Sequence, residues 1–271
     1  MDIEIEGGIH IKLNKFDKTS TVVQSPNATG NIIIPRFVIQ GGKEYLITSI
    51  SKHAFKECEI ESLSFAEDSE VTSFDGWIFV RTTIKKLQIP PKLAKIDDCW
   101  LGWANEIREI SISPANKNFK FIDNQFLVDK SEDTLYYARN DIEEAVIPQE
   151  VKIVKKNSFS KHPDLKSIIF PENSKLKIIE GYSFYSSPLQ KLVLPASVEK
   201  IDSHNFQGID NLVDIEISPK NEHFKIFDNK YILTKSDTNI QTFDVLFLAS
   251  RDIQIVQIPS QIKKISDFAI H

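Results

Sequence analysis

The most constraining feature of this chain is a short pattern, apolar-x-x-apolar-x-apolar, that recurs eight times in its 271 residues. The eight strings begin at Ile60, Ile84, Ile107, Ile142, Leu165, Leu189, Leu212 and Ile253. Their starts are 24, 23, 35, 23, 24, 23 and 41 residues apart, so five spacings are nearly equal and two are long. A repeating period of this length indicates a stack of small units rather than a domain with one central core. Such a stack favours a binding surface over a catalytic pocket.

A second pattern keeps the same period. In it an apolar residue is followed, four and five positions later, by a variable residue and a bulky one. This pattern begins at Ile50, Phe74, Ile96, Val154, Ile179, Ile201 and Ile265. We expect it to cross the opposite wall of each unit with one short helical turn and to bury its bulky residue.

The first pattern alternates, so it predicts a short strand whose alternate side chains face inward. Proline directly follows the last apolar residue at Pro35, Pro90, Pro148, Pro171, Pro195 and Pro259. Because proline has no N–H, it ends the ladder and turns the chain. No unit can bury its apolar face alone, so the units must stack with their strands in a parallel sheet on one wall. The predicted fold is an α/β solenoid.

A longer repeat, with an offset of 105 residues, is superimposed on this short period. Ile89-Pro90 matches Leu194-Pro195, Asn116 matches Asn221, Phe119-Lys120 matches Phe224-Lys225, and Asp123-Asn124 matches Asp228-Asn229. The matches extend into the two long units, which indicates that their insertions are a duplicated element. Each insertion alternates around its Asp-Asn pair, which predicts a β-hairpin turn. A calcium site is the alternative use of these carboxylates, although the usual ligand spacing is missing.

These repeats predict the domain organisation. Residues 1–48 are expected to form a β-rich N-terminal cap, and residues 49–271 the repeat solenoid. The long inserted units lie at about 110–144 and 215–255. The last residues, Phe268 to His271, fall in the middle of a unit, so we expect the array to be truncated at its C-terminal end.

Composition narrows the function classes. Lys and Arg number 33 and Asp and Glu 38, which gives a net charge of −5 without a basic run, so we expect no nucleic-acid partner. No apolar stretch approaches 18 residues, so no membrane span is expected, and the N-terminus lacks the features of a signal peptide. Cys58 and Cys99 occupy different places in their units, which predicts buried thiols rather than a disulfide.

Several strings resemble the BspA-like (Treponema pallidum-type) leucine-rich repeat family. They are Ile50 to Cys58, Leu165 to Pro171, Leu194 to Ile201 and the insertion from Asn116 to Asn124. The resemblance covers roughly residues 30–271. It implies a right-handed leucine-rich repeat with short helical turns and β-hairpin insertions. It also implies an adhesin-like or surface-antigen-like protein that binds host or matrix proteins.

The residues suggest one candidate partner-binding site. The position after the middle apolar residue of each string is apolar in three consecutive units, at Val146, Ile169 and Val193. Adjacent strands lie about 4.8 Å apart, so these side chains would form an exposed ridge. Its polar rim would consist of Glu144, Lys191 and Glu216. Exposed apolar patches with polar rims often mark partner sites; the alternative is that β-branched residues simply favour strands.

No enzyme motif is present. The sequence has no Gly-x-Ser-x-Gly, no His-Glu-x-x-His, no phosphate-binding glycine loop and no Cys-x-x-Cys, so no catalytic residue, metal or cofactor is expected. His53 and Cys58 are five residues apart, but they belong to the second pattern and are explained better by structure. A non-catalytic protein-binding module is therefore predicted. The alternative is an intracellular scaffold or oligomerisation module that self-associates, and the location is cell-surface by the resemblance or cytoplasmic by the sequence.

Overall fold

A computed structural model describes residues 2–104, 106–237 and 239–270. The chain divides into two compact units, residues 1–120 and 121–271, which are described separately below. His271, named above with the last residues of the array, lies outside the described residues. The proposed boundary of an N-terminal cap at residue 48 stays a prediction.

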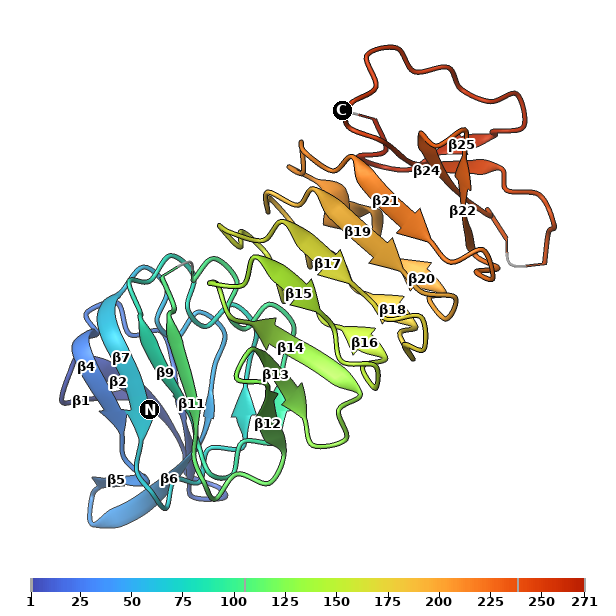
Figure 1. Ribbon diagram of the computed structural model, residues 1–271. Coiled ribbons are helices and arrows are strands. Elements are labelled where there is room, and N and C mark those ends of the chain that lie inside the picture. The colour runs from blue at the N-terminus through green and yellow to red at the C-terminus, as the bar shows by residue number, and fades with distance from the viewer. Residues whose placement is uncertain (1, 105, 238, 271) are drawn as a thin grey trace. The chain divides into compact units, whose positions relative to one another are not determined.

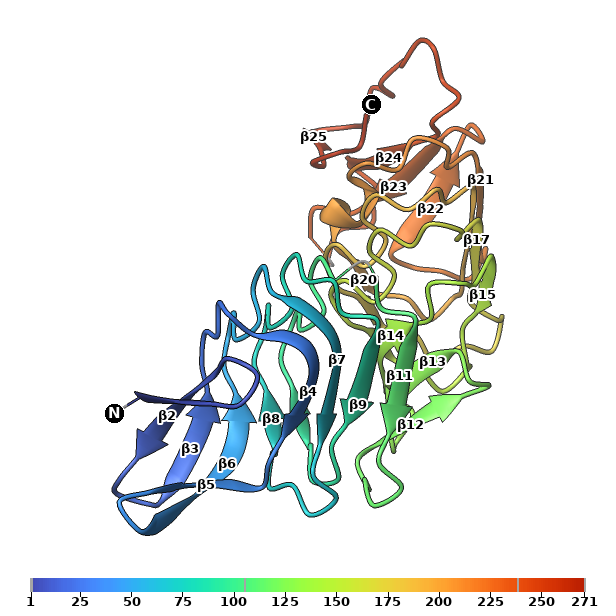
Figure 2. The same cartoon turned by 90° about the vertical axis from the view of Figure 1, so that its left-hand side faces the viewer.

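The first unit contains two sheets, which lie on opposite walls in Figure 2. One has the order β1-β2-β3-β6-β8-β10, with β5 beside β6: β1 (Asp2–Ile5), β2 (Ile9–Asn14), β3 (Thr19–Val22), β5 (Phe37–Gln40), β6 (Lys43–Ile50), β8 (Ser73–Phe74) and β10 (Lys95–Ile96). The other has the order β11-β9-β7-β4 and is parallel throughout: β4 (Thr29–Ile34), β7 (Glu59–Phe65), β9 (Lys86–Ile89) and β11 (Glu109–Ile112).

The second unit repeats this arrangement. One sheet has the order β12-β13-β14-β16-β18-β20: β12 (Phe119–Ile122), which spans the boundary between the units, β13 (Phe126–Asp129), β14 (Thr134–Ala138), β16 (Ile153–Val154), β18 (Ile178–Ile179) and β20 (Lys200–Ile201). The facing sheet is parallel, with the order β15-β17-β19-β21 (Figure 1): β15 (Glu144–Val146), β17 (Ser167–Ile169), β19 (Lys191–Leu194) and β21 (Asp214–Ile217). The last sheet contains β22 (Phe224–Phe227), β23 (Tyr231–Thr234), β24 (Val245–Ala249) and β25 (Lys264–Ile265).

The parallel sheets and the inward bulky residues confirm the predicted unit, except that Leu101 is only partly buried and Ile270 is exposed. The middle residues of the strands, such as Ile168 and Leu192, are fully buried, as are the bulky residues Phe159, Phe184 and Phe206 of the second pattern. All five belong to one continuous hydrophobic core. Phe159 and Phe184 belong to adjacent repeats, and their ring centroids are 6.0 Å apart. Burial is therefore shared between neighbouring repeats, as the period requires.

The predicted helical turns are wrong, except in the unit whose second pattern begins at Ile201. Among the described residues the only helix is the 3₁₀-helix η1 (Ser203–Phe206), whose first turn is capped by the Asp202 carboxylate. In the other turns, pairs of non-glycine residues four positions apart have positive φ: His53 and Glu57, Trp77 and Arg81, Cys99 and Trp103, Asn157 and Lys161, Tyr182 and Ser186. A left-handed residue cannot continue a right-handed helix. Each segment is therefore a series of tight turns.

The eighth string is not a strand, contrary to expectation. Ile253, Val256 and Ile258 lie in a segment without a strand, and Ile258 is half exposed. The equivalent strand β15, at the start of its own sheet, pairs only with β17 of the next repeat. No such partner follows Ile253–Ile258 within the described part of the chain. The pattern alone does not maintain a strand without a neighbour to share its backbone hydrogen bonds.

The hairpin insertions are confirmed and are duplicates. β22 and β23 pair antiparallel on either side of Asp228-Asn229, and β12 and β13, on either side of Asp123-Asn124, are hydrogen-bonded neighbours in their sheet. Asp123 and Asn124, and Asp228 and Asn229, all have positive φ between 49° and 55°. This backbone is that of a type I′ turn, which explains the Asp-Asn pairs by turn geometry. Among the residues that the structure describes, no group of three or more His, Cys, Asp or Glu side chains could hold a metal ion.

Candidate protein-binding site

The sheet β15-β17-β19-β21 aligns the predicted ridge residues. Val146 is in register with Ile169, Ile169 with Val193, and Val193 with Glu216. The residues that precede them in each strand, Ala145, Ile168 and Leu192, are buried in the core. Because side chains alternate along a strand, the ridge residues point to the opposite, outward face. The structure therefore brings the three apolar side chains into one row.

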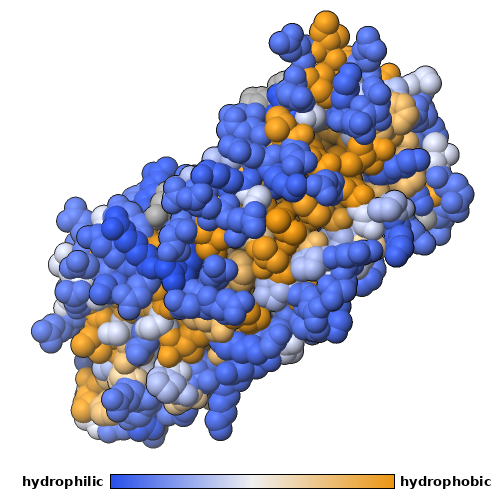
Figure 3. Space-filling model, in the orientation of Figure 1, coloured by the Kyte–Doolittle hydropathy of each residue, from blue (hydrophilic) through white to orange (hydrophobic). Residues whose placement is uncertain are grey.

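The ridge is partly open to solvent. Val146 is 50% exposed, while Ile169 and Val193 are partly buried between neighbouring strands. Figure 3 shows hydrophobic residues gathered in a band over this sheet, with hydrophilic residues on both sides.

The rim residues form an ion-pair network. Lys191 Nζ lies 2.5 Å from Glu216 Oε1 and 3.0 Å from Asp214 Oδ2. These hydrogen bonds, first to Glu216 and then to Asp214, raise the pKa of Lys191. Glu144 Oε2 accepts a hydrogen bond from Ser167 Oγ at 3.2 Å. Two carboxylates thus surround one ammonium group, which leaves this end of the rim with an excess negative charge.

The parallel sheet of the first unit offers an internal comparison. At the position that corresponds to the ridge, it carries Ile33, Ser64, Gln88 and Ser111. Three of these are polar, but Ile33 on the edge strand β4 is 67% exposed. An exposed β-branched residue therefore occurs in this row outside the ridge as well. Strand propensity is the alternative explanation of the ridge, and the substitution Ile169→Lys separates the two.

Sequence reasoning missed the open edge of this sheet. β21 pairs with β19 on one side, and no described strand pairs with its other side. Next to that edge lies a small open recess, lined by Val213, Ile215, Ile226, Asn229, Lys230, Tyr231, Ile232 and Ser250. Ile215 and Ile226 are only partly buried. The repeat period predicted the strand but contained no signal for the side on which it would stay unpaired.

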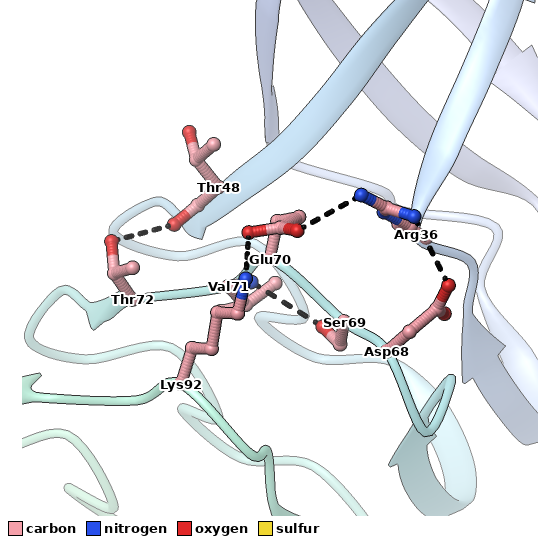
Figure 4. A network of polar contacts seen from close by, with 8 residues as sticks. All are labelled: Arg36, Thr48, Asp68, Ser69, Glu70, Val71, Thr72 and Lys92. Atoms are coloured by element: carbon pink, nitrogen blue, oxygen red, sulfur yellow. Dashed lines mark hydrogen bonds and ion pairs between the residues drawn. The ribbon is translucent and has the colours of Figure 1, made fainter.

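A second polar network links the loops of three successive repeats in the first unit (Figure 4). Arg36 donates to Asp68 Oδ2 at 3.3 Å and to Glu70 Oε1 at 3.2 Å, and Lys92 Nζ lies 2.6 Å from Glu70 Oε2. The hydrogen bond from Lys92 lowers the pKa of Glu70, with a further contribution from Arg36. All the charges in this cluster have partners within the protein. The cluster joins neighbouring loops through paired charges.

The two cysteines lie in the protein interior. Cys58 and Cys99 are buried thiols that form no disulfide, as predicted. Cys58 Sγ donates to the backbone oxygen of Ser25 at 3.0 Å, and burial raises the pKa of this thiol. A raised pKa disfavours the thiolate that a nucleophilic cysteine needs.

No helix among the described residues is long and apolar enough to span a membrane.

Comparison with known proteins adds to these findings. The sequence profile of the BspA type leucine-rich repeat region matches six copies, over residues 43–131 and 129–245. A leucine-rich cell surface protein from Faecalibacterium prausnitzii A2-165 is 21% identical with a TM-score of 0.59, over 99% of this chain and 67% of that one. A leucine-rich repeat protein from Eubacterium ventriosum ATCC 27560 is 18% identical with a TM-score of 0.52, over 82% and 73%. Both likenesses show the fold. No curated protein sequence matches the chain.

Proposed function

Because this chain belongs to the BspA-type leucine-rich repeat family, we propose that it is a non-catalytic protein-binding module that uses the outward face of β15, β17, β19 and β21. In this proposal the repeats form a right-handed solenoid whose parallel sheet displays the ridge. Val146, Ile169 and Val193 supply the apolar centre. Glu144, Lys191 and Glu216 supply the polar rim.

One observation carries the proposal. Three apolar side chains lie in register on an outward sheet face, and the first of them is half exposed. Interfaces commonly have an apolar centre, where most binding energy arises, and a polar rim that stays solvated. A rigid sheet also positions such side chains with little ordering cost on binding. Fold alone does not supply a function, so the argument depends on this face.

We propose an adhesin-like or surface-antigen-like role for the partner-binding face, with a host or matrix protein as partner. This role is supported by membership in the family, whose repeats resemble those of surface proteins. The competing role is an intracellular scaffold. Accessibility to protease in intact cells separates the two, because only a surface protein is cleaved without lysis.

The test of the face is the substitution Ile169→Lys, which places a charge at the centre of the ridge. The matched control is Ser111→Lys, at the corresponding position of β11, where the row is polar. Each protein would be immobilised and exposed to extracellular-matrix and host-surface proteins, and in parallel to cytosolic lysate. We expect Ile169→Lys to lose captured surface proteins that Ser111→Lys retains, with thermal unfolding unchanged in both.

Two results would contradict the proposal. If Ile169→Lys unfolds the protein, Ile169 is a core residue and not part of a binding face. If the folded variant captures the same proteins in the same amounts as the unsubstituted chain, binding takes place elsewhere, with the hairpin insertions as the next candidates.

A further inference from the structure

β21 has an unsatisfied edge that can accept another strand. Asp214 N–H donates to the Gln190 oxygen at 3.0 Å, and Ser218 N–H donates to the Leu194 oxygen at 3.0 Å, so these alternate residues face β19. Consecutive residues of a strand direct their backbone groups to opposite edges. The N–H and C=O groups of Ile215 and Ile217 therefore face away from β19, where no described strand lies.

The side chains beside this edge define two different environments. Inward, the recess exposes parts of Ile215 and Ile226 next to the buried ring of Tyr231. Outward, Asp214 and Glu216 are exposed, two residues apart. Figure 1 shows the edge of β21 turned toward β22, from which part of the recess lining comes. An added strand would thus meet the side chains of Ile215 and Ile226 on one face and carboxylates on the other.

The charge of the edge is not neutralised by the chain. Lys191 from β19 contacts both Asp214 and Glu216, so one ammonium group serves two carboxylates. On the far rim of the recess, Lys230 and Asp228 are 4.0 Å apart and offset each other. One negative charge remains in excess along β21. Opposite charges directly across neighbouring strands stabilise the pairing, while like charges oppose it.

We propose that the open edge of β21 binds an extended peptide in which basic and aliphatic residues alternate. Its backbone pairs with Ile215 and Ile217, its aliphatic side chains point toward the recess, and its Lys or Arg side chains lie beside Asp214 and Glu216. This mode, in which a peptide adds a strand to a sheet edge, gains affinity from main-chain hydrogen bonds and specificity from alternate side chains. The site shares Glu216 with the rim of the ridge, but it does not depend on the proposed function.

The chain itself provides the pattern for this partner. On the other side of β21, β19 places Lys191 outward against the two carboxylates and Leu192 inward in the core. A peptide that presents Lys-Val-Lys to the open edge repeats this arrangement. The alternative role of Asp214 and Glu216 is protective, because charged residues on edge strands commonly prevent unwanted pairing. In that case a basic peptide would not bind.

The probe is the capped heptapeptide Lys-Val-Lys-Val-Lys-Val-Lys, titrated into the full chain and followed by amide NMR and hydrogen exchange. Unpaired amides exchange readily and paired ones slowly. We therefore expect the amides of Ile215 and Ile217 to become protected on binding, while that of Glu216, which already faces β19, changes little. The matched peptide with Glu in place of every Lys should bind at least tenfold more weakly.

N-methylated peptides test whether the backbone makes the contact. In an antiparallel complex the N–H groups of the valines face β21, and in a parallel complex those of the lysines do. N-methylation of all valines, or of all lysines, should therefore abolish binding in one peptide and spare it in the other. Equal binding or equal loss in the two peptides would overturn strand addition.

Charge substitutions in the protein locate the site. Asp214→Asn and Glu216→Gln should each weaken peptide binding about two- to fivefold, which is the range expected for the loss of an exposed ion pair. The control Glu199→Gln removes a carboxylate that also pairs with one lysine, Lys177, but adjoins β20 on the other wall, and should leave binding unchanged. Ile169→Lys should also leave peptide binding unchanged. A result that refutes protein binding at the ridge is therefore distinguishable from one that refutes peptide binding at the edge. Absence of peptide binding, or equal weakening by Glu199→Gln, would refute the proposal.

Discussion

Replacement of Asn221 tests how the repeats are joined, because this side chain connects two of them. Its amide nitrogen donates to the backbone oxygens of Pro195 at 3.0 Å and Val198 at 3.0 Å in the preceding repeat. Its Oδ1 accepts from the backbone N–H groups of His223 at 2.8 Å and Phe224 at 2.7 Å. Asn221 is buried, so water does not readily replace these partners. Asn221→Ala therefore removes these four hydrogen bonds at once, together with a longer one from the amide nitrogen to the Ala196 oxygen at 3.3 Å.

The expected magnitude follows from these four bonds. A neutral hydrogen bond contributes about 0.5–1.5 kcal/mol, and buried groups left without a partner cost more. The turn is near the surface and some freed groups will rehydrate, so we expect Asn221→Ala to lower the free energy of unfolding by about 2–4 kcal/mol. For a unit of this size that is a fall in melting temperature of about 5–15 °C. Asn221→Asp keeps the acceptor but loses both donors, and should be at least as destabilising at neutral pH.

The duplicate site and an exposed asparagine provide the controls. Asn116 makes the same contacts one insertion earlier, with Pro90 and Leu93 as acceptors and Asn118 and Phe119 as donors. Asn116→Ala should therefore cost a similar amount, while Asn211→Ala, at an exposed position, should stay within about 0.5 kcal/mol. Urea denaturation of all three variants measures these values. A cost for Asn221→Ala no larger than that for Asn211→Ala would refute the reasoning.

Two further predictions concern the core and its pH dependence. Phe159→Ala should lower the free energy of unfolding by about 3–5 kcal/mol, because this ring is buried between Phe126 and Phe184. The same denaturation assay should show almost no loss for Phe16→Ala, because the Phe16 ring is fully exposed. Equal losses in the two variants would contradict the packing argument. Burial lowers the pKa of His162, whose Nε2 contacts the Arg139 oxygen while its buried Nδ1 has no partner. The unfolded chain therefore binds a proton at His162 more readily than the folded chain does. The stability contributed by neutral His162 is present above the unfolded pKa of about 6.5, and it is lost as the pH falls below that value. Unfolding free energies measured from pH 7.5 to 5.5 should fall more steeply for the unsubstituted chain than for His162→Gln; parallel curves would exclude this origin.

The strands could be predicted from the sequence because their signal is local and repeated. The strings that begin at Leu165 and Leu189 contain β17 and β19, and their equal lengths also place the strands in register. The left-handed turns could not be predicted in the same way. Positive φ is normally indicated by glycine or asparagine, but here Trp77, Tyr182 and Ser186 adopt it. Neither glycine nor asparagine marks these three positions, so the sequence contains no local signal for the turns.

For the candidate site, the repeat pattern predicts which face of the sheet each side chain takes but not how exposed it is. Alternation along β15, β17 and β19 determines which face each side chain takes, so the alignment of Val146, Ile169 and Val193 follows from the sequence. Their exposure does not, because it depends on neighbouring strands: Val146 lies on the edge strand and is half exposed, while the other two are flanked on both sides. The open edge of β21 depends in turn on the position of the hairpin β22–β23, which lines the recess without pairing with that edge. A repeat therefore specifies the interior of the sheet, and the insertion that interrupts it determines where the sheet is free to bind another strand.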